Sequence, residues 1–351
     1  MSLLHPANPE APHLDTLTPH AAIPGGAFEI TGTHLLQQQT PHLPHATFGE
    51  TEASLDVSRE TRARIRVPSG AISSDLTLHR DGLTSNILHA NIGVPMAEEL
   101  HLVSNPAVDA DNNLFAMVSG PRGERVPVSI FRIDRDLQIR PFVRDLLNVS
   151  ALAFDREGYL YASSRSEGTI YKISPQGAIS TFSEGMGIAT GIAFDKDGNL
   201  YVGDRSGTIF KINPAREIFV FATLEPSVAA YHLAFRDDGT LLVTAPTTSS
   251  NQSIYAIDPD GNTTIFFRGL GRPQGMALDT DNNLYVAASL HGQRGIIRIT
   301  TPTDNSEPKG ELLVSGNDLV GLCFLEDGCA ALASNTTLFH IDLGIQGRPL
   351  I

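Results

Sequence analysis

Short apolar stretches recur at a regular interval from about residue 97 to the C-terminus, and each one leads into a polar turn and a second apolar stretch. Six such segments align with one another: NPAVDADNNLFAMVS, ALAFDREGYLYASS, GIAFDKDGNLYVGD, HLAFRDDGTLLVTA, GMALDTDNNLYVAA and GLCFLEDGCAALAS. The residues that open their turns lie 40 to 46 positions apart and are Asp109, Asp155, Asp195, Arg236, Asp279 and Leu325. This period is typical of one blade of a β-propeller, so the pattern predicts six blades.

Each repeat is expected to form four strands. The first is short and apolar and ends at a D-x-D-G turn, where Asp195 and Gly198 are the residues that a type I turn prefers at its first and fourth positions. The second strand follows the turn. The third strand repeats a small, apolar, aromatic, polar, apolar pattern in SIFRI, TIYKI, TIFKI, SIYAI, GIIRI and TLFHI. Amphipathic outer strands follow as QIRPFV, AISTF, EIFVFATL, TTIFF and ELLVS.

The sixth repeat has no such outer strand before the chain ends. An unpaired outer edge would favour association with other chains. The segment EELHLVS, residues 98–104, has the alternation of a strand and lies directly before the first repeat. We predict that it pairs with the sixth repeat and closes the ring.

Residues 14–93 have a different rhythm, with short alternating stretches that Gly and Pro interrupt. This pattern predicts a small β-sandwich. Residues 1–13 are expected to be a flexible segment before it. The predicted fold class is therefore all-β, with an immunoglobulin-like sandwich followed by a six-bladed β-propeller over residues 97–351.

Composition supports this fold class. The 351 residues are 41% hydrophobic and contain 31 Gly and 22 Pro but no Trp, which suits many short strands joined by tight turns. The two cysteines, Cys323 and Cys329, are placed by the predicted hairpin on opposite faces of a sheet, so we expect free thiols.

The formal net charge of −14 disfavours nucleic acid and anionic membranes as partners. No apolar run approaches the roughly 20 residues of a membrane span. The N-terminal residues also lack the pattern of a secretory signal. We expect a soluble protein, cytoplasmic as the sequence is written, or extracytoplasmic if a signal has been removed.

The repeats resemble the NHL-repeat propellers and the related senescence-marker and gluconolactonase superfamily, which implies a six-bladed ring. That superfamily has ligand-binding, protein-binding and enzymatic members, so the resemblance leaves the function open. Residues 14–93 resemble an immunoglobulin-like domain of the IPT/TIG type. The residues that carry this second resemblance are Pro19, Pro24, Gly25, Gly26, Ile30, Gly32, Phe48, Gly49, Val67, Pro68, Ser85 and Asn86.

A propeller gathers the starts of its innermost strands around one mouth of its central channel, where ligands are expected. The aligned repeats place one residue from each blade at this position: Ser104, Ser150, Thr190, Tyr231, Gln274 and Val320. The set is polar but uncharged.

The resemblance to gluconolactonase-like enzymes implies a metal held by Glu, Asn and Asp, two of them at this mouth. Here Gln274 and Thr190 stand at the corresponding positions. A hard divalent cation prefers carboxylate oxygens, so no metal ligand is assigned. Ca²⁺ or Zn²⁺ is expected only if the chain is a divergent lactonase. Eight histidines before residue 90 show no ligand spacing either.

Charged candidates lie slightly further along the blades. Asp204, His232 and His291 are weak candidates for general acid and base catalysis, provided that they meet. Arg165, Arg205 and Arg272 could add a polar funnel for an anionic or sugar-like ligand. The leading hypothesis is a binding module whose channel mouth holds a small polar ligand or a loop of a protein partner. The alternative is a divergent metal-dependent hydrolase of the gluconolactonase type.

Overall fold

The computed structural model describes residues 10–36, 43–120, 124–166, 168–249, 251–301 and 306–348. The chain forms two compact units. The first comprises the residues up to Val94 together with Leu313–Asn317, and the second comprises Pro95–Leu312 and the residues from Asp318 onward. The described residues are almost entirely strands and turns, with a short 3-10 turn at Glu326–Gly328.

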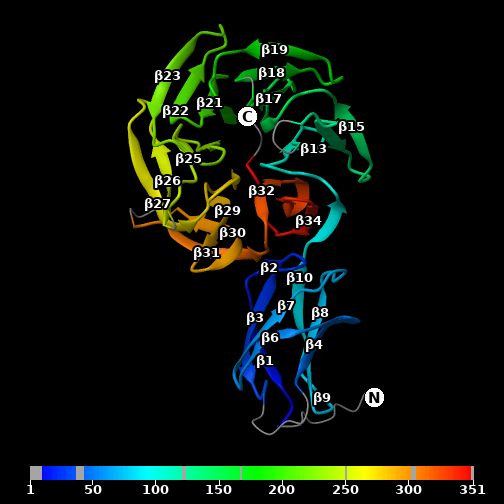
Figure 1. The fold of residues 1–351 in the computed structure, drawn as a ribbon. Helices are drawn as coiled ribbons and strands as arrows, with labels where there is room; N and C mark the ends of the chain where they lie inside the picture. The colour runs from blue at the N-terminus through cyan, green and yellow to red at the C-terminus, as the bar shows by residue number, and fades with distance from the viewer. Residues whose placement is uncertain are drawn as a thin grey trace. The chain divides into compact units, whose positions relative to one another are not determined.

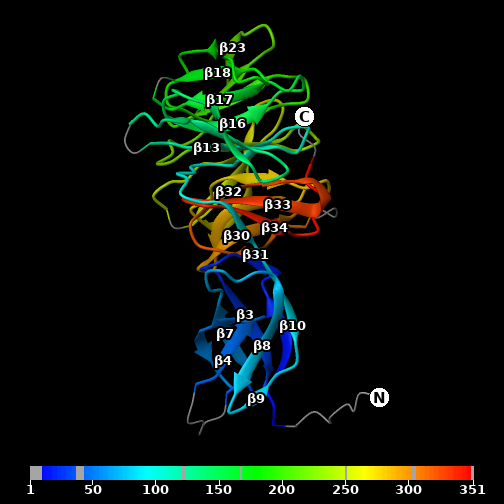
Figure 2. The ribbon, with the colours of Figure 1, turned by 90° about the vertical axis from the view of Figure 1, so that its right-hand side faces the viewer.

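The first unit is built from two β-sheets, and some of their strands are labelled in Figure 2. One sheet has the order β1-β3-β7-β6, with β1 (His13–Thr18), β3 (Ala27–Thr33), β7 (Arg62–Arg66) and β6 (Leu55–Ser58). The other has the order β2-β10-β8-β4-β5, with β2 (Ala21–Ala22), β10 (Leu88–Ile92), β8 (Ser74–Arg80), β4 (His45–Phe48) and β5 (Thr51–Ala53); β9 (Leu83–Thr84) pairs with β8. The expectation of a flexible segment over residues 1–13 concerns mainly residues 1–9, which lie outside the described residues.

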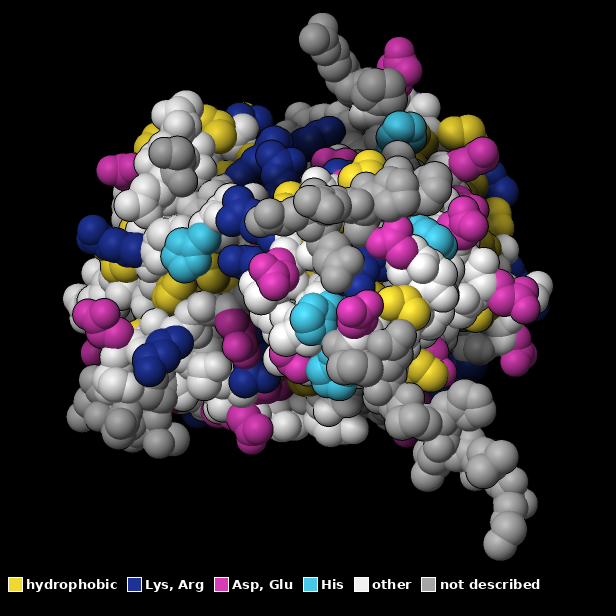
Figure 3. All heavy atoms as spheres, turned by 90° about the horizontal axis from the view of Figure 1, so that it is seen from below, with side chains coloured by type: hydrophobic (Ala, Val, Ile, Leu, Met, Phe, Trp, Pro, Cys, Tyr) yellow, Lys and Arg dark blue, Asp and Glu magenta, His cyan; other side chains and the backbone are white. Residues whose placement is uncertain are grey.

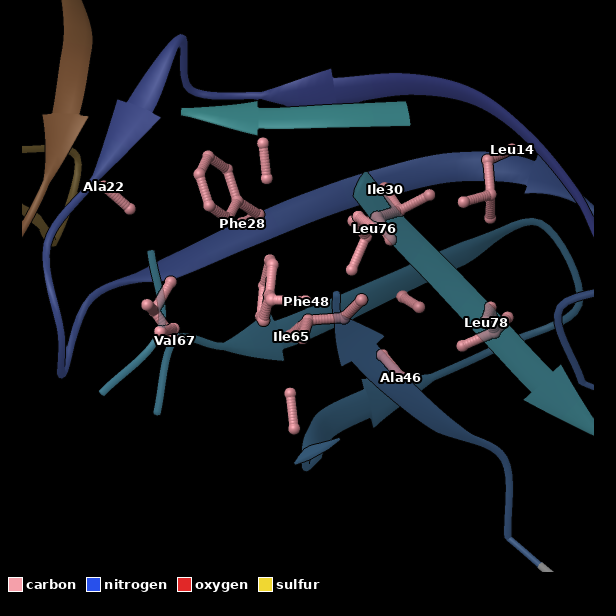
Figure 4. Packing of buried hydrophobic residues seen from close by; sticks show 14 of the residues in the cluster. Leu14, Ala22, Phe28, Ile30, Ala46, Phe48, Ile65, Val67, Leu76 and Leu78 are labelled. Carbon is pink, nitrogen blue, oxygen red and sulfur yellow. The ribbon is translucent and has the colours of Figure 1, made fainter. Parts of the chain in front are cut away.

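The core of the first unit lies between the two sheets. Phe28 and Ile65 from one sheet and Phe48, Leu76 and Leu78 from the other belong to a single buried cluster (Figure 4). The alternation of buried and exposed positions along β3 and β7 supplies one wall of this core, as the sequence pattern predicts.

A short segment from late in the chain also belongs to the first unit. Val314 and Ser315 pair in parallel with Ala21 and Ala22, and the Ser315 hydroxyl accepts a 3.0 Å hydrogen bond from the Ala27 amide. This pairing was not predicted, because the sequence pattern assigns the same residues only to the outer strand of the fifth repeat.

The second unit is a β-propeller in which the described residues form six four-stranded groups, called blades one to six below. Blade one has β12 (Ala107–Val108), β13 (Leu114–Met117), β14 (Ile130–Ile133) and β15 (Ile139–Val143). Blade two has β16 (Val149–Phe154), β17 (Leu160–Ser164), β18 (Thr169–Ile173) and β19 (Ile179–Ser183). Blade three has β20 (Ala189–Phe194), β21 (Leu200–Asp204), β22 (Thr208–Ile212) and β23 (Ile218–Thr223).

Blade four has β24 (His232–Phe235), β25 (Leu241–Thr244), β26 (Gln252–Ile257) and β27 (Thr263–Gly271). Blade five has β28 (Met276–Leu278), β29 (Leu284–Leu290), β30 (Gln293–Thr300) and β31 (Lys309–Ser315). Blade six has β32 (Leu319–Phe324), β33 (Cys329–Ser334), β34 (Leu338–Asp342) and β11 (Val94–Ala97). Neighbouring innermost strands contact one another from β12 through β16, β20, β24, β28 and β32 and back to β12, so the blades form a ring (Figure 1).

The turns between the first two strands of the blades have the predicted geometry. In blade three the Asp195 carboxylate accepts hydrogen bonds from the Asp197 and Asn199 amides at 2.9 Å, and Gly198 has a φ of +80°. This left-handed conformation explains the glycine at that position.

Aromatic side chains join several blades. A ring on the second strand of one blade contacts the ring that ends the innermost strand of the next, edge to face, in the pairs Phe115–Phe154, Tyr161–Phe194, Tyr201–Phe235 and Tyr285–Phe324. These contacts help to explain why single blades depend on their neighbours for a core.

The strand that closes the ring was predicted wrongly. Blade six pairs with β11, Val94–Ala97, and not with residues 98–104. The alternation in that later segment has another cause: Leu100 and Leu102 are buried in the core beneath blade six. Their amides bond to the carbonyls of Thr336 and Asn335 at the β33–β34 turn, so the segment is not free to extend β34.

Candidate functional site

The channel mouth at the starts of the innermost strands is more enclosed than the sequence suggested. Ser104, Ser150, Thr190, Tyr231 and Val320 are all buried, and Gln274 is half-buried. The Thr190 hydroxyl donates to the Gly203 carbonyl at 2.8 Å and accepts from the Tyr231 amide at 3.1 Å. Ser150 contacts the Asn148 carbonyl at 3.5 Å. These predicted ligand-binding residues mainly bond to the protein itself.

Ser104 and His232 meet inside the channel. The Ser104 hydroxyl lies 3.2 Å from Nδ1 of His232, and both side chains are buried. Blade one supplies Ser104 and blade four supplies His232, and these blades stand opposite each other in the ring. Burial lowers the pKa of His232 to about 4, so the imidazole is neutral at pH 7.

Asn105 completes this layer. Its amide nitrogen donates to the Met276 carbonyl at 2.8 Å, and its oxygen accepts from the Leu322 amide at 3.1 Å. The chain makes room with glycine, since a Cβ on Gly275 would lie 2.0 Å from the Asn105 oxygen and one on Gly321 would lie 2.5 Å away. We call Ser104, Asn105 and His232 the cross-channel layer, because their bonds link blade one to blades four, five and six.

Asp204 bonds to the loop before β20 and to the loop after β21. Its carboxylate accepts a 2.8 Å bond from the Ile188 amide and a second bond from the Ser206 hydroxyl. The carboxylate also packs against Gly187, where a Cβ would lie within 2.9 Å of it. Asp204 is only 6% exposed, and its partners account for both of its oxygens.

The remaining candidates lie apart from the cross-channel layer. His291 is exposed in the two-residue turn that it forms with Gly292 between β29 and β30. Arg272 is exposed as well. In the part of the chain that the structure describes, Asp204, His232 and His291 make no hydrogen bond to one another. A catalytic unit of these three side chains remains a prediction without a supporting contact.

Arg165 and Arg205 are the predicted residues that do form a group at the mouth. They occupy equivalent positions directly after the second strands of blades two and three, and both are half-buried. Burial, and then the positive charge of Arg205, lower the pKa of the Arg165 guanidinium. Arg165 donates to the Ser119 hydroxyl at 3.0 Å and Arg205 donates to the Val228 carbonyl at 3.2 Å.

No carboxylate within the described ranges forms an ion pair with either arginine. The Nε of Arg205 is buried there without a hydrogen-bond partner. Two neighbouring cations that lack an anionic partner form a local positive site on a protein whose net charge is −14. On the surface drawn in Figure 3, by contrast, acidic and basic side chains are interspersed.

Beyond the cross-channel layer the channel opens into a cavity of about 220 Å³. Its wall includes one small residue from each innermost strand, and these are Ala107, Ala153, Ala193, Ala234, Ala277 and Cys323. Cys323 and Cys329 are both free thiols, as predicted, and burial raises the pKa of Cys323 to about 12.

Arg348 lies at the other end of this cavity and was missed by the sequence analysis. Its guanidinium donates to the Phe235 carbonyl and pairs with Asp237. Its amide bonds to the Leu278 carbonyl at 3.0 Å, while Gly347 bridges to Asp279. Arg348 also lines an adjoining hollow of about 720 Å³, so its side chain separates the two spaces. Arg348 follows the last repeat in the chain, so the alignment of the repeats makes no prediction about it.

The residues at the mouth do not fit a divalent metal ion. Thr190 uses its hydroxyl for Gly203 and Tyr231, and Gln274 offers only a neutral side-chain amide where a hard cation prefers carboxylate oxygens. Among the described residues no three His, Cys, Asp or Glu side chains come together as a possible metal site. Within those residues there is also no helix long and apolar enough to cross a membrane.

Comparison with known proteins identifies the fold. The model of the family described as strictosidine synthase-like, N-terminal, matches residues 191–212, and no curated protein matches the chain. A putative gluconolactonase is 18% identical, with a TM-score of 0.58 over 73% of this chain and 93% of that one. A gluconolactonase from Xanthomonas campestris is 14% identical, with a TM-score of 0.56 over 71% and 89%. The second unit has the fold of the gluconolactonase-type β-propellers.

Several solved structures align with residues of both units. An auxiliary nutrient binding protein from Bacteroides thetaiotaomicron is 13% identical, with a TM-score of 0.53 over 95% of this chain and 98% of that one. At these identities the likeness concerns the fold alone.

Proposed function

We propose that the protein is a binding module whose propeller mouth holds a small anionic ligand, or an acidic side chain on a partner loop, between Arg165 and Arg205. One observation carries the proposal: Arg165 and Arg205 occupy equivalent half-buried positions on neighbouring blades, and no described carboxylate pairs with them. Burial, and then the charge of Arg205, lower the pKa of Arg165. A bound carboxylate or phosphate would relieve this repulsion and supply an acceptor for the buried Nε of Arg205.

The surroundings favour binding over catalysis. His232 bonds to Ser104 and Asp204 bonds to Ile188 and Ser206, so neither side chain is directed by its hydrogen bonds toward a ligand beside the arginines. The fold is shared with a protein described as nutrient-binding, which agrees with a ligand-holding role.

The test is calorimetric titration of the protein with gluconate, citrate and inorganic phosphate at low ionic strength. We expect at least one of these anions to bind. The R165Q/R205Q double variant should bind it at least tenfold more weakly, because both charge-assisted donors are lost. R156Q is the matched control, since Arg156 is exposed on the turn between β16 and β17, at the opposite end of the blade from Arg165. Equal affinity of the double variant and the wild-type protein would overturn the proposal.

A metal-dependent lactonase is the second candidate, because two structural relatives carry gluconolactonase in their names. The hydrogen bonds made by the Thr190 hydroxyl and the neutral side chain of Gln274 argue against it. Turnover of glucono-lactone in the presence of Ca²⁺ or Zn²⁺, reduced by T190A or Q274A, would establish the lactonase instead.

For the first unit we infer an immunoglobulin-like domain of the IPT/TIG type that serves as a spacer or an adhesion element. The two-sheet arrangement around one core supports this inference. So do Gly25 and Gly49, two of the residues that carry the resemblance, which take positive φ angles of 85° and 57° at turns. Deleting residues 1–93 should leave anion binding by the propeller unchanged if the inference is correct.

A further inference from the structure

We propose that the cavity in the propeller channel is a second binding site, and that it takes a small neutral carboxamide with an apolar body. The site is separate from the arginine pair at the mouth, since none of the described residues that line the cavity is Arg165 or Arg205.

The size and lining of the cavity define the body of the ligand. A cavity of about 220 Å³ exceeds the roughly 150 Å³ that holds benzene in an engineered protein cavity. Apart from Asn105 and Arg348, its side chains are alanines, larger aliphatic residues and phenylalanines, together with Pro106 and Cys323. These groups would contact an apolar body by dispersion and exclude water from it.

Backbone groups on the channel wall define the polar end of the ligand. Each innermost strand is the edge of its own blade, so the N–H and C=O groups on its inner side have no partner within that blade. Some are bonded across blades, as the Val320 carbonyl is by the Gly275 amide. The side-chain amide of Asn105 shows how such groups are satisfied, because it donates to the Met276 carbonyl and accepts from the Leu322 amide. A carboxamide is therefore already bound by this wall.

The same backbone groups are present on three other blades. Met276 stands opposite Val286 and Leu322 opposite Leu332. The equivalent residues occupy the same register: Leu152 stands opposite Ala162, Ile192 opposite Val202 and Leu233 opposite Val243. The N–H and C=O of Leu152, Ile192 and Leu233 thus point into the channel as those of Met276 and Leu322 do. A ligand amide could use them as Asn105 uses its two partners.

The cavity offers no unpaired cationic side chain to an anionic ligand among its described lining residues. Arg348 is the one charged side chain among its described lining residues, and its guanidinium is bonded to the Phe235 carbonyl and to Asp237. Because a buried ion without a partner is costly, a neutral molecule is favoured. Arg348 separates the cavity from the adjoining hollow, so we expect it to control entry.

The experiment uses benzamide, with benzoate as its charged counterpart. We expect a crystal of the full chain grown with benzamide to show the molecule in the channel, with its amide on one of the strand edges of blades two to four. Binding measured by calorimetry should be weakened at least tenfold in A193L, which fills the cavity. A178L is the control, because Ala178 is exposed on a turn of blade two. R348A should raise the association and dissociation rates together.

The two proposed sites are distinguished by the arginine variant. R165Q/R205Q should bind benzamide as the wild-type protein does, whereas any binding of benzoate should be lost in that variant. An empty channel at saturating benzamide, or unchanged affinity in folded A193L, would overturn the channel site and leave the anion site standing.

Discussion

The hydroxyl of Ser104 and Nδ1 of His232 lie 3.2 Å apart, although 128 residues separate them in the chain. Their bond crosses the propeller channel between opposite blades and, with Asn105, separates the mouth from the cavity below it. The two residues were expected to face a ligand, but they face each other. The burial of His232 in this bond therefore predicts a pH dependence of the protein's stability.

We expect the stability of the protein to fall in acid through His232. The folded-state pKa of about 4 lies below the ordinary value of 6.5, so folding favours the neutral imidazole. The stability that this preference contributes is fully present above pH 6.5. It is lost as the pH falls, and the loss in the free energy of unfolding reaches about 3 kcal/mol at pH 4. Urea unfolding at pH 7, 5 and 4 measures this loss.

The control is H232Q, which keeps a polar side chain next to Ser104 and has no imidazole to protonate. Between pH 7 and pH 4 this variant should lose about 3 kcal/mol less than the wild-type protein does. Parallel pH profiles for the two proteins would show that His232 is not the group responsible.

Asp204 should behave as a structural residue. D204A removes the acceptor of the Ile188 amide and of the Ser206 hydroxyl, and we expect it to lower the free energy of unfolding by about 2 kcal/mol. D204N keeps an acceptor and should cost less. Urea midpoints of both variants give the comparison. If D204A instead kept its stability but lost an activity found for the wild-type protein, Asp204 would be a catalytic residue.

The closure of the ring by β11 predicts a sharp boundary for truncation. A protein without residues 1–93 keeps all of Val94–Ala97 and should elute as a monomer. Removing four further residues exposes the edge of β34, and this protein should aggregate or unfold at a lower temperature. Size-exclusion chromatography of the two truncated proteins is the measurement, and identical profiles would argue against closure by β11.

The first unit contains a second acid-sensitive group. The ring of His79 stacks on that of His45 with centroids 4.9 Å apart, and burial together with His45 lowers the pKa of His79. Protonation of His79 is thus opposed by the fold, so its contribution to stability is lost as the pH falls below its ordinary value of 6.5. In an NMR titration H45Q should raise the pKa of His79, and an unchanged value would show that the stacked ring has no electrostatic effect.

The repeats could be predicted because their signals are local. Asp195 caps its own turn and Gly198 takes a positive φ within four residues, so the turn is encoded where it forms. The small, apolar, aromatic, polar, apolar pattern of strands such as Thr208–Ile212 likewise involves only neighbours along the chain. At residues 98–104 the local pattern predicts a strand wrongly, because the alternating leucines are buried without pairing along β34.

The candidate site could be predicted only in part. Arg165 and Arg205 both directly follow the second strand of their blades, and this equivalence can be predicted from the repeat alone. The burial of Thr190 and the exposure of His291 depend on contacts between blades and on the length of one hairpin. Arg348 lies outside the repeats and was found only in the structure.

By itself the sequence determined an all-β chain with propeller repeats, because turns and strand alternation are set by residues a few positions apart. Only the tertiary structure decided what occupies the channel. The bond between Ser104 and His232, the amide of Asn105 on Met276 and Leu322, and the position of Arg348 all join segments more than a hundred residues apart. Their geometry follows from how the blades close around a common axis, which no local pattern encodes.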